Sequence, residues 1–357
     1  MLLAGDEPFS ESQFQKRILD WSEAPGYFDT DNFISNEPSY LHVVPLLLKI
    51  APSSQAYIGV GPDQNFSYIA HLKPKIAIIL DIRRDNLLQH LYFKELFRVA
   101  NDRWEYLSYL FGKPLPNKIE RDPAADAKAL AHCFREIHSS ETYFEENFAR
   151  FWESLQSRFP LLVLESDEPI FYRMASAFFR MNLDLKFQSH QCYPRPFYPN
   201  YEDLITAADK EGALRNYLND DGAFEFLKRM QDDNRLLPVV GDFGEGKALR
   251  AVGQYLRERD YVVAAFYVSN VEFYLLRSGR FSSFASSVAQ LPMSASSVFI
   301  RSYFSYWREH PETVPGLYVT SILQYMERFV GLNEKAPYQD YWDVVMRDYI
   351  PALSPLP

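Results

Sequence analysis

The pattern of apolar and polar positions is most informative between residues 56 and 84, which read AYIGVGPDQNFSYIAHLKPKIAIILDIRR. Small and apolar residues lead up to Gly59, and apolar side chains then recur at helical spacing over residues 66–72. A second apolar run, residues 76–80, is rich in β-branched side chains and ends at Asp81, about twenty residues after the first glycine. The pattern therefore predicts a strand, a glycine turn, a helix and a second strand, which together form a βαβ unit.

A second unit of this kind follows later in the chain. Residues 236–243 (LLPVVGDF) predict a strand, residues 245–259 (EGKALRAVGQYLRER) a helix and residues 262–270 (VVAAFYVSN) another strand. A long helix is expected over residues 319–330. Between the two units, helical periodicity extends too far for a plain crossover, so we predict a helical insertion at about residues 112–185.

These patterns define the expected organisation of the chain. Residues 1–50 are predicted to hold amino-terminal helices and a lid-like loop, and residues 51–357 are predicted to form one α/β domain. The alternation of strands with helices favours a mainly parallel sheet flanked by helices. Extra elements follow this sheet toward the carboxyl terminus.

Composition and charge argue against several classes of partner. The net charge of −10 and the pI near 5.3 accompany no concentrated basic face, so we expect no extended nucleic-acid surface. No run approaches the roughly eighteen apolar residues of a spanning helix, and the amino terminus has no signal-peptide pattern, so we expect a cytoplasmic protein without membrane contact. Cys133 and Cys192 lack metal or redox spacing and the seven histidines are scattered, which predicts neither a disulfide nor a bound metal.

The glycine turn carries candidate chemistry. Gly59 and Gly61 have no Cβ, so backbone amides there can approach a ligand, and the next helix presents unpaired N–H groups. Asp81 ends the neighbouring strand, where a carboxylate can accept hydrogen bonds from a ribose diol. Together these features favour a nucleoside-containing ligand over a purely structural turn. The dinucleotide fingerprint requires a third glycine where this chain has Gln64, which disfavours NAD.

Two sequence motifs resemble a known family. The GVG turn after a strand, with an acid ending the next strand, resembles the cofactor site of class I S-adenosylmethionine-dependent methyltransferases. Residues 59–84, together with PVVGDFGEGKALRAVGQYLRE (238–258) and VAAFYVSNVEFYL (263–275), are similar to an uncharacterised bacterial family with a methyltransferase-like fold. The resemblance extends over residues 27–303 and implies a Rossmann-like sheet of the methyltransferase type, with S-adenosylmethionine as the cofactor.

The resemblance also implies roles for individual residues. Gly59 and Gly61 would lie beneath the cofactor, and Asp81 would hold its ribose. Neighbouring positions of the turn and of the strand end are predicted to complete the cofactor site; these are Asp63, Gln64, Asn65, Ile82 and Arg83. Asp242 occupies a position where many methyltransferases place substrate or catalytic groups and is our candidate base, with capping of the following helix as an equal alternative.

Further candidates come from the rim of the predicted sheet and from the amino-terminal loop. Ser269 and Asn270 follow the next parallel strand and are expected on this rim. Glu272, two residues further on, either shares the rim or lies on a solvated helix turn. In the loop DTDNFISNEPSY, Asn36 and Glu37 are predicted to contact substrate as part of a lid, or to belong to a turn that begins a helix.

Departures from the methyltransferase pattern leave the function open. Tyr57 stands where methyltransferases usually carry an acid, and Asp63 stands in place of a frequent third glycine. Either Asp63 replaces the missing acid in binding the methionine amino group, or the cofactor has been lost. We therefore expect methyl transfer to an unknown small or peptidic acceptor, or alternatively a non-catalytic ligand-binding or regulatory protein. A third hypothesis, an NADP-linked enzyme, would require Arg83 or Arg84 to bind a 2′-phosphate.

Overall fold

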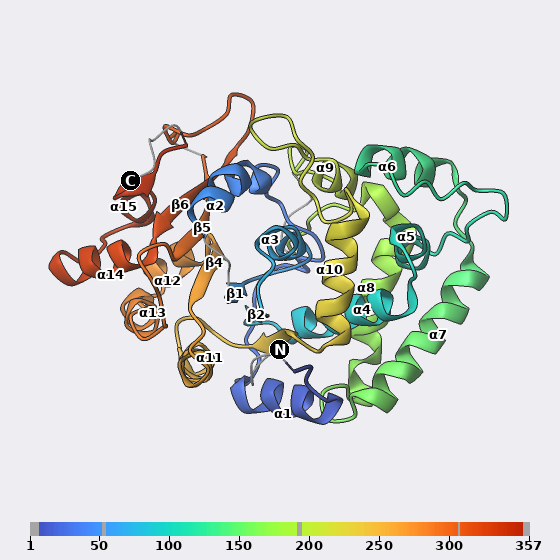
Figure 1. The fold of residues 1–357 in the computed structure, drawn as a ribbon, viewed down its shortest axis with the longest axis horizontal. Coiled ribbons are helices and arrows are strands. Elements are labelled where there is room, and N and C mark those ends of the chain that lie inside the picture. Colours follow the sequence, from blue (N-terminus) through green and yellow to red (C-terminus); the bar gives the residue numbers. More distant parts are fainter. Residues whose placement is uncertain (1–6, 52–54, 191–194, 306–307, 353–357) are drawn as a thin grey trace.

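The computed structural model describes residues 7–51, 55–190, 195–305 and 308–352. Figure 1 shows one twisted sheet with helices packed on it. Seven strands lie in the order β3–β2–β1–β4–β5–β6–β7. Their bounds are β1 (Ala56–Gly59), β2 (Ile76–Asp81), β3 (Leu236–Val240), β4 (Val263–Ser269), β5 (Val298–Phe304), β6 (Val319–Tyr325) and β7 (Tyr349–Ile350).

The sheet is mixed, which corrects the expectation of a mainly parallel one. Strands β3, β2, β1, β4 and β5 are parallel to one another, whereas β6 pairs antiparallel with β5 and β7 pairs antiparallel with β6. The expected helix over residues 319–330 is wrong in its first half, since that stretch forms β6. Its residues are buried on both faces of the sheet, so their polarity does not alternate with a period of two. The α/β class and the flanking helices are confirmed.

Two layers of helices cover the sheet. One layer holds α2 (Val44–Ile50), α3 (Gln64–Leu72), α4 (Arg84–Val99) and α10 (Asp221–Asp232). The other holds α1 (Glu11–Trp21), α11 (Lys247–Glu258), α13 (Phe281–Val288) and α14 (Met326–Lys335). Two short helices, α12 (Val271–Arg277) and α15 (Tyr341–Met346), pack against each other, and α12 also contacts β4. The parallel strands are thereby shielded from water on both faces, as their continuous apolar sequences require.

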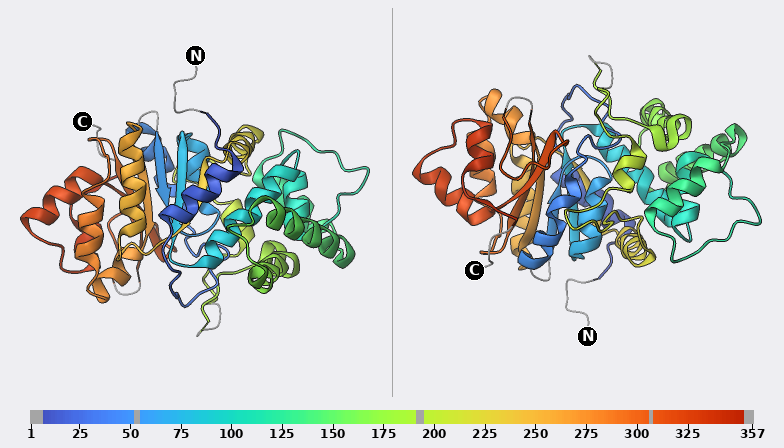
Figure 2. Two further views of the ribbon diagram at one scale, coloured as in Figure 1. Left: turned by 90° about the horizontal axis from the view of Figure 1, so that it is seen from below. Right: turned by 90° about the horizontal axis from the view of Figure 1, so that it is seen from above.

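The remaining helices gather mainly at one end of the molecule, opposite the carboxyl-terminal elements (Figure 2). They are α5 (Arg103–Phe111), α6 (Ala127–Glu136), α7 (Glu141–Arg158), α8 (Glu168–Met181) and α9 (Tyr201–Ile205), with short 3₁₀ helices at Glu165–Asp167 and Asn182–Asp184. A further 3₁₀ helix, Tyr40–Val43, lies elsewhere and contacts β6 and α2. Helix α4 joins this group to the sheet, because it contacts β3 on one side and α5, α7 and α8 on the other.

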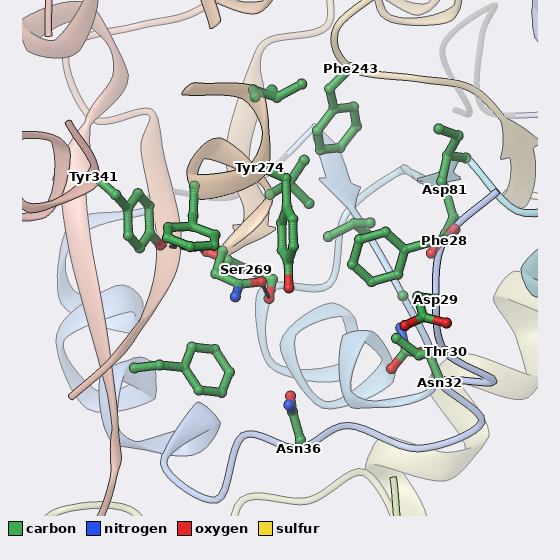
Figure 3. Close-up of a pocket in the computed structure, with 18 of the residues that line it drawn as sticks. Phe28, Asp29, Thr30, Asn32, Asn36, Asp81, Phe243, Ser269, Tyr274 and Tyr341 are labelled. Carbon is green, nitrogen blue, oxygen red and sulfur yellow. Dashed lines mark hydrogen bonds between the residues drawn. The ribbon is translucent and has the colours of Figure 1, made fainter. Parts of the chain in front are cut away.

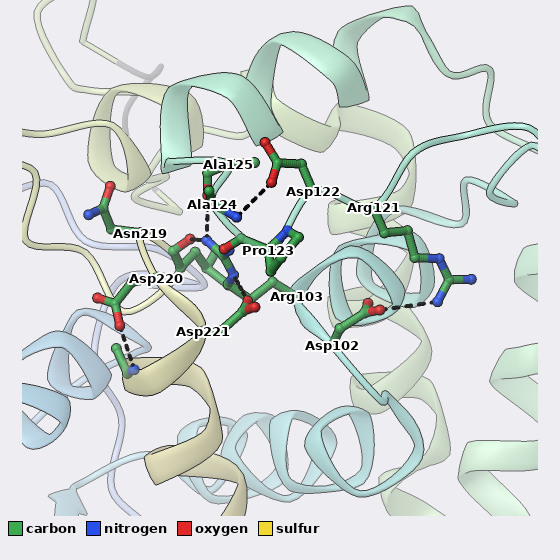
Figure 4. Close-up of polar contacts among 12 residues, drawn as sticks. Asp102, Arg103, Arg121, Asp122, Pro123, Ala124, Ala125, Asn219, Asp220 and Asp221 are labelled. Atoms are coloured by element: carbon green, nitrogen blue, oxygen red, sulfur yellow. Dashed lines mark hydrogen bonds and ion pairs between the residues drawn. The ribbon is translucent and has the colours of Figure 1, made fainter.

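A fully buried arginine at the start of α5 fastens this group to the rest of the fold (Figure 4). Arg103 donates from Nε to the Asp221 carboxylate (2.6 Å), from Nη1 to the carbonyls of Ala125 and Leu218 (2.8 Å each) and from Nη2 to the Pro123 carbonyl (3.0 Å). The fixed fork of the guanidinium can reach several acceptors at once. Arg103 thus ties the connection before α6 to the beginning of α10.

Candidate functional site

A cavity of about 1140 Å³ lies where the carboxyl ends of the parallel strands meet. Its wall includes Gly61 after β1, Asp81 at the end of β2, Asp242 after β3 and Ser269 at the end of β4. The strand order reverses between β1 and β4, because the chain proceeds from β1 to β2 and β3 on one side and from β4 to β5 on the other. In open α/β sheets such a point leaves a crevice that binds ligands. We call this cavity the cleft.

The segment of residues 22–39, here called the strap, runs along the cleft. The backbone N–H of Glu23 donates to the carbonyl of Val240 at the end of β3 (2.9 Å). The N–H of Gly26 donates to the carbonyl of Ile82, just after β2 (2.9 Å). The strap therefore follows the strand ends from the edge of the sheet toward its centre and supplies part of the cleft wall.

An aromatic contact joins the strap to α12. Figure 3 shows Phe28 of the strap next to Tyr274 of α12, and both residues line the cleft. Their ring centroids lie 5.0 Å apart in an edge-to-face arrangement, which is a favourable geometry for aromatic pairs. These two residues were not predicted from the sequence, because only the folded chain brings positions 28 and 274 together.

The Asn65 side chain fills the inside of the glycine turn. Its Nδ2 donates to the carbonyls of Val60 (2.9 Å) and Pro62 (2.7 Å), and its Oδ1 accepts a hydrogen bond from Tyr57 Oη (2.7 Å). A Cβ at Gly59 would lie 2.0 Å from this Oδ1, so glycine is required there by packing against Asn65. The structure thus places Gly59 and Asn65 behind the turn, outside the residues that line the cleft.

Gly61 lies on the cleft side of the same turn. It lines the cleft and has a φ of +83°, a conformation that favours glycine. Its carbonyl oxygen is 2.9 Å from His90 Nε2. Burial lowers the pKa of His90 to about 4, so this imidazole is neutral at physiological pH and holds the turn from within.

Asp63 points away from the cleft. Its Oδ2 accepts hydrogen bonds from Tyr201 Oη (2.7 Å) and Tyr217 Oη (3.2 Å), and the residue does not line the cleft. Burial raises the pKa of Asp63 to about 6, although the two tyrosine hydroxyls partly offset this shift. The carboxylate that was expected to replace the missing methyltransferase acid is therefore engaged inside the protein.

Asp81 lies at the cleft wall but is paired with Arg83. The guanidinium donates to Asp81 from Nε (3.1 Å to Oδ1) and from Nη2 (2.9 Å to Oδ2), and the Arg83 N–H donates to Oδ1 as well (2.9 Å). Arg83 also binds the Asp31 carbonyl of the strap (2.7 Å). A carboxylate offers about four acceptor positions, so three of the Asp81 positions are occupied and one remains.

Arg84 is paired as well, since it forms an ion pair with the buried Asp167 and donates to the Leu162 carbonyl (2.8 Å). The guanidinium groups of Arg83 and Arg84 thus both have carboxylate partners within the chain. This arrangement removes the free arginine that a 2′-phosphate of NADP would need.

Asp242 faces the cleft with an arginine partner. Arg280 forms an ion pair with its Oδ2, and the N–H of Gly244 donates to its Oδ1 (2.7 Å). The expected alternative, capping of the next helix, is not what Asp242 does. Glu23 of the strap takes that position, because its Oε1 accepts from the N–H of Ala248 in the first turn of α11 (2.6 Å).

Glu37 is buried, with 2% of its surface exposed, at the strap side of the cleft. Its carboxylate accepts hydrogen bonds from Tyr267 Oη (2.7 Å), Ser302 Oγ (2.5 Å) and Ser269 Oγ. Burial raises the pKa of Glu37, and the three hydroxyl donors partly counteract this effect. Tyr267 was not predicted, although its spacing of two from Ser269 in one strand could have placed both on the same face.

Ser269 stands in an unusual backbone conformation. Its φ is +52°, which is uncommon for a non-glycine residue, and the pairing of β4 with β5 shifts register between Tyr267 and Ser269. Figure 3 shows the side chains of Ser269 and Asn36 beside the same part of the cavity. Asn270 adjoins them, with its Oδ1 3.5 Å from Ser269 Oγ.

The structure brings most of the predicted site residues together. Those that line the cleft are Asn36, Glu37, Gly61, Gln64, Asp81, Ile82, Arg83, Asp242, Ser269 and Asn270. The neighbouring Glu272 is fully buried rather than solvated and forms an ion pair with Arg301.

Within the described residues no group of three or more His, Cys, Asp or Glu is placed to hold a metal ion, and no helix is long and apolar enough to cross a membrane. Cys133 is a free thiol, and Cys192 lies outside the described residues.

The mixed sheet and the cleft at its strand ends define an α/β protein with one candidate ligand site among its described residues. The chain belongs to the family of the domain of unknown function DUF7790, whose model matches residues 33–158 and 180–348. The matched ranges include Glu37, the glycine turn and the ends of β2, β3 and β4. A search of curated proteins finds no match to the chain.

Proposed function

We propose that this chain is an S-adenosylmethionine-dependent methyltransferase that acts on an unknown acceptor. The observation that carries the proposal is the position of the cleft at the reversal of strand order, with Gly61 and Asp81 on its wall. The resemblance of the GVG turn and the following acid to class I methyltransferases supports the choice of cofactor.

The dimensions of the cleft support a two-ligand site. Ligand pockets usually measure roughly 300 to 1000 Å³, and the cleft measures about 1140 Å³. It therefore has room for a nucleoside cofactor and a small acceptor side by side. Phe28 and Tyr274 offer aromatic surface to a planar base.

The residues of the cleft would act mainly by positioning. Gly61 admits a ligand close to the backbone, and the remaining acceptor position of Asp81 suits one ribose hydroxyl. The bound cofactor would supply an electrophilic methyl group on a sulfonium. The strap would exclude water and hold the acceptor in line, so that proximity accounts for most of the catalysis.

A second candidate function is ligand binding without catalysis. It is favoured by the pairing of Asp81 with Arg83 and of Asp242 with Arg280, since these ion pairs occupy carboxylate oxygens that a catalytic base would use. This candidate predicts cofactor binding without any transfer of the methyl group.

Calorimetric titration with S-adenosylmethionine and S-adenosylhomocysteine tests both candidates. We expect the wild-type protein to bind both ligands, and Asp81→Asn to weaken binding about tenfold through loss of a ribose contact. Gly61→Val should abolish binding, because it adds a branched side chain at a positive φ on the cleft wall. Glu258→Gln, which changes an exposed acid of α11, is the matched control.

The outcomes separate the two candidates. Absence of binding by the folded wild-type protein would contradict both. Binding together with transfer of a tritiated methyl group to a cell-extract fraction supports the enzyme, and binding without transfer supports the non-catalytic protein. If Asp81→Asn binds as tightly as wild type while its melting temperature is unchanged, the ribose assignment is wrong.

A further inference from the structure

Glu37 differs from the other two carboxylates of the cleft that were expected to have a function. Asp81 and Asp242 each have an arginine partner, whereas no Lys or Arg among the described residues pairs with Glu37. Its hydrogen-bond donors are neutral hydroxyl groups. A buried carboxylate without a cation is costly, and a positively charged ligand group would lower that cost.

The cleft gives access to this carboxylate through Ser269. Ser269 is half-buried at the cleft wall, and its Oγ donates to Glu37 Oε1. Asn36, the neighbour of Glu37 in the strap, also lines the cleft, and Figure 3 shows its amide across an open space from Ser269. An ammonium group between them could donate to the hydroxyl oxygen of Ser269 and to the amide oxygen of Asn36, with the Glu37 carboxyl group directly behind Ser269, and its positive charge would favour the ionised form of Glu37.

Aromatic side chains surround the same part of the cleft. Tyr303, Phe304 and Tyr341 line it, and the Tyr341 hydroxyl donates to the carbonyls of Ser302 (2.9 Å) and Ser269 (3.3 Å). The faces of aromatic rings attract cations, and their surfaces also accommodate an apolar substituent. An alkyl or aryl ammonium ion combines both properties.

We propose that the Glu37 side of the cleft, formed with Ser269 and Asn36, binds the amino group of an amine substrate in its protonated form. The inference rests on the proposed function, because it names the acceptor class as an amine. For methyl transfer the bound ammonium would first lose a proton to Ser269 Oγ as that hydroxyl passes its own proton to Glu37, so that the nitrogen lone pair would attack the sulfonium methyl and the thioether would leave. The inference can nevertheless be tested separately from the proposed function, since amine binding can be measured without any cofactor.

A comparison of a protonated amine with its neutral counterpart tests the inference. The probes are 2-phenylethylamine and 2-phenylethanol, titrated separately at neutral pH and followed by protein-detected NMR. We expect the wild-type protein to bind the amine at least ten times more tightly than the alcohol. Glu37→Gln, which keeps the size and most hydrogen-bonding capacity of the side chain, should bring the two affinities within about a factor of two. Glu258→Gln on the remote surface should keep the tenfold preference.

The outcomes are distinct from those of the cofactor titration. Equal affinity of the wild-type protein for amine and alcohol overturns the inference, and so does failure to bind the amine at millimolar concentration. These two results need no variant, so they hold even if Glu37→Gln does not fold. A preserved amine preference in folded Glu37→Gln also overturns it. Amine binding without S-adenosylmethionine binding would leave this inference in place while removing the proposed function.

Discussion

Ionisation of the buried Asp63 lowers the free energy of unfolding. Burial raises its pKa from 3.8 to about 6, while Tyr201 and Tyr217 donate hydrogen bonds to it. Between these two pH values the folded protein binds more protons than the unfolded chain, so stability falls as pH rises through this range. The carboxylate therefore lowers stability at neutral pH.

The variant Asp63→Asn removes this titration. We expect the free energy of unfolding of wild type, measured relative to Asp63→Asn, to decrease by about 3 kcal/mol between about pH 3.5 and about pH 7. Urea unfolding at several pH values measures this difference, with Glu258→Gln as a control for an exposed acid. A difference that does not change with pH would show that Asp63 ionises normally in the folded protein.

Glu272 and Arg301 form a buried ion pair, with no exposed surface on either side chain. Arg301 donates to Glu272 from Nε (2.5 Å) and Nη2 (3.0 Å), and from Nη1 to Gln324 (2.7 Å). Glu272→Ala leaves the arginine buried without its carboxylate and should lower the free energy of unfolding by about 3–5 kcal/mol. The double variant Glu272→Met/Arg301→Met should lose less than Glu272→Ala alone. Chemical denaturation compares the two, and equal losses would contradict a cost that arises from an unpaired charge.

At the scale of elements, the connection between α5 and α6 depends on Arg103. Replacement by methionine keeps much of the side-chain volume but leaves Asp221 and three backbone carbonyls without their donor. We expect Arg103→Met to lower the free energy of unfolding by at least about 3 kcal/mol. Arg121→Met removes an exposed pairing with Asp102 and Glu105 and should cost less than about 1 kcal/mol. Similar effects of the two variants in urea unfolding would mean that Arg103 does not fasten this region.

The elements of the parallel part of the sheet were largely predictable from sequence. Residues 76–80 and 236–243 are short apolar runs between turn signals, and both contain buried strands. Helix α11 lies inside the predicted range 245–259, because its apolar residues recur with a helical period. The strand over Val319–Tyr325 was missed, since a strand buried on both faces resembles a buried helix in its pattern of polarity.

The candidate site was predictable in position but not in its pairings. Strand ends of a parallel sheet meet at one edge, so Gly61, Asp81 and Ser269 could be expected to lie close together. The ion pair between Asp242 and Arg280 depends on where the helices after β4 lie, which local sequence does not specify. Asn65 was expected to bind cofactor, whereas in the folded protein its amide lies inside the turn and bonds to the turn's own carbonyls, a contact that the sequence pattern does not specify.

At the scale of the whole molecule, the strap joins distant parts of the chain around the cleft. Phe28→Ala removes its edge-to-face contact with Tyr274, worth about 1 kcal/mol beyond area burial. We expect amide hydrogen exchange in residues 26–32 to become severalfold faster, with little change in the core strands, because local opening requires only local contacts to break. Mass spectrometry after deuterium labelling measures this effect, with Leu164→Ala as an exposed apolar control. Unchanged exchange in the strap would show that other contacts hold it.

The hydrogen bonds of Glu37 also constrain when the cleft can be completed during synthesis. Its partners Tyr267, Ser269 and Ser302 are 230, 232 and 265 positions away along the chain. The strap is synthesised before β4 and β5, so the Glu37 carboxylate cannot contact these hydroxyls until both strands have been made. Because contacts of such long range form late in folding, the Glu37 side of the cleft can be completed only after β4 and β5 have been synthesised, and a nascent chain that stops before Val298 lacks Ser302 and has no complete cleft.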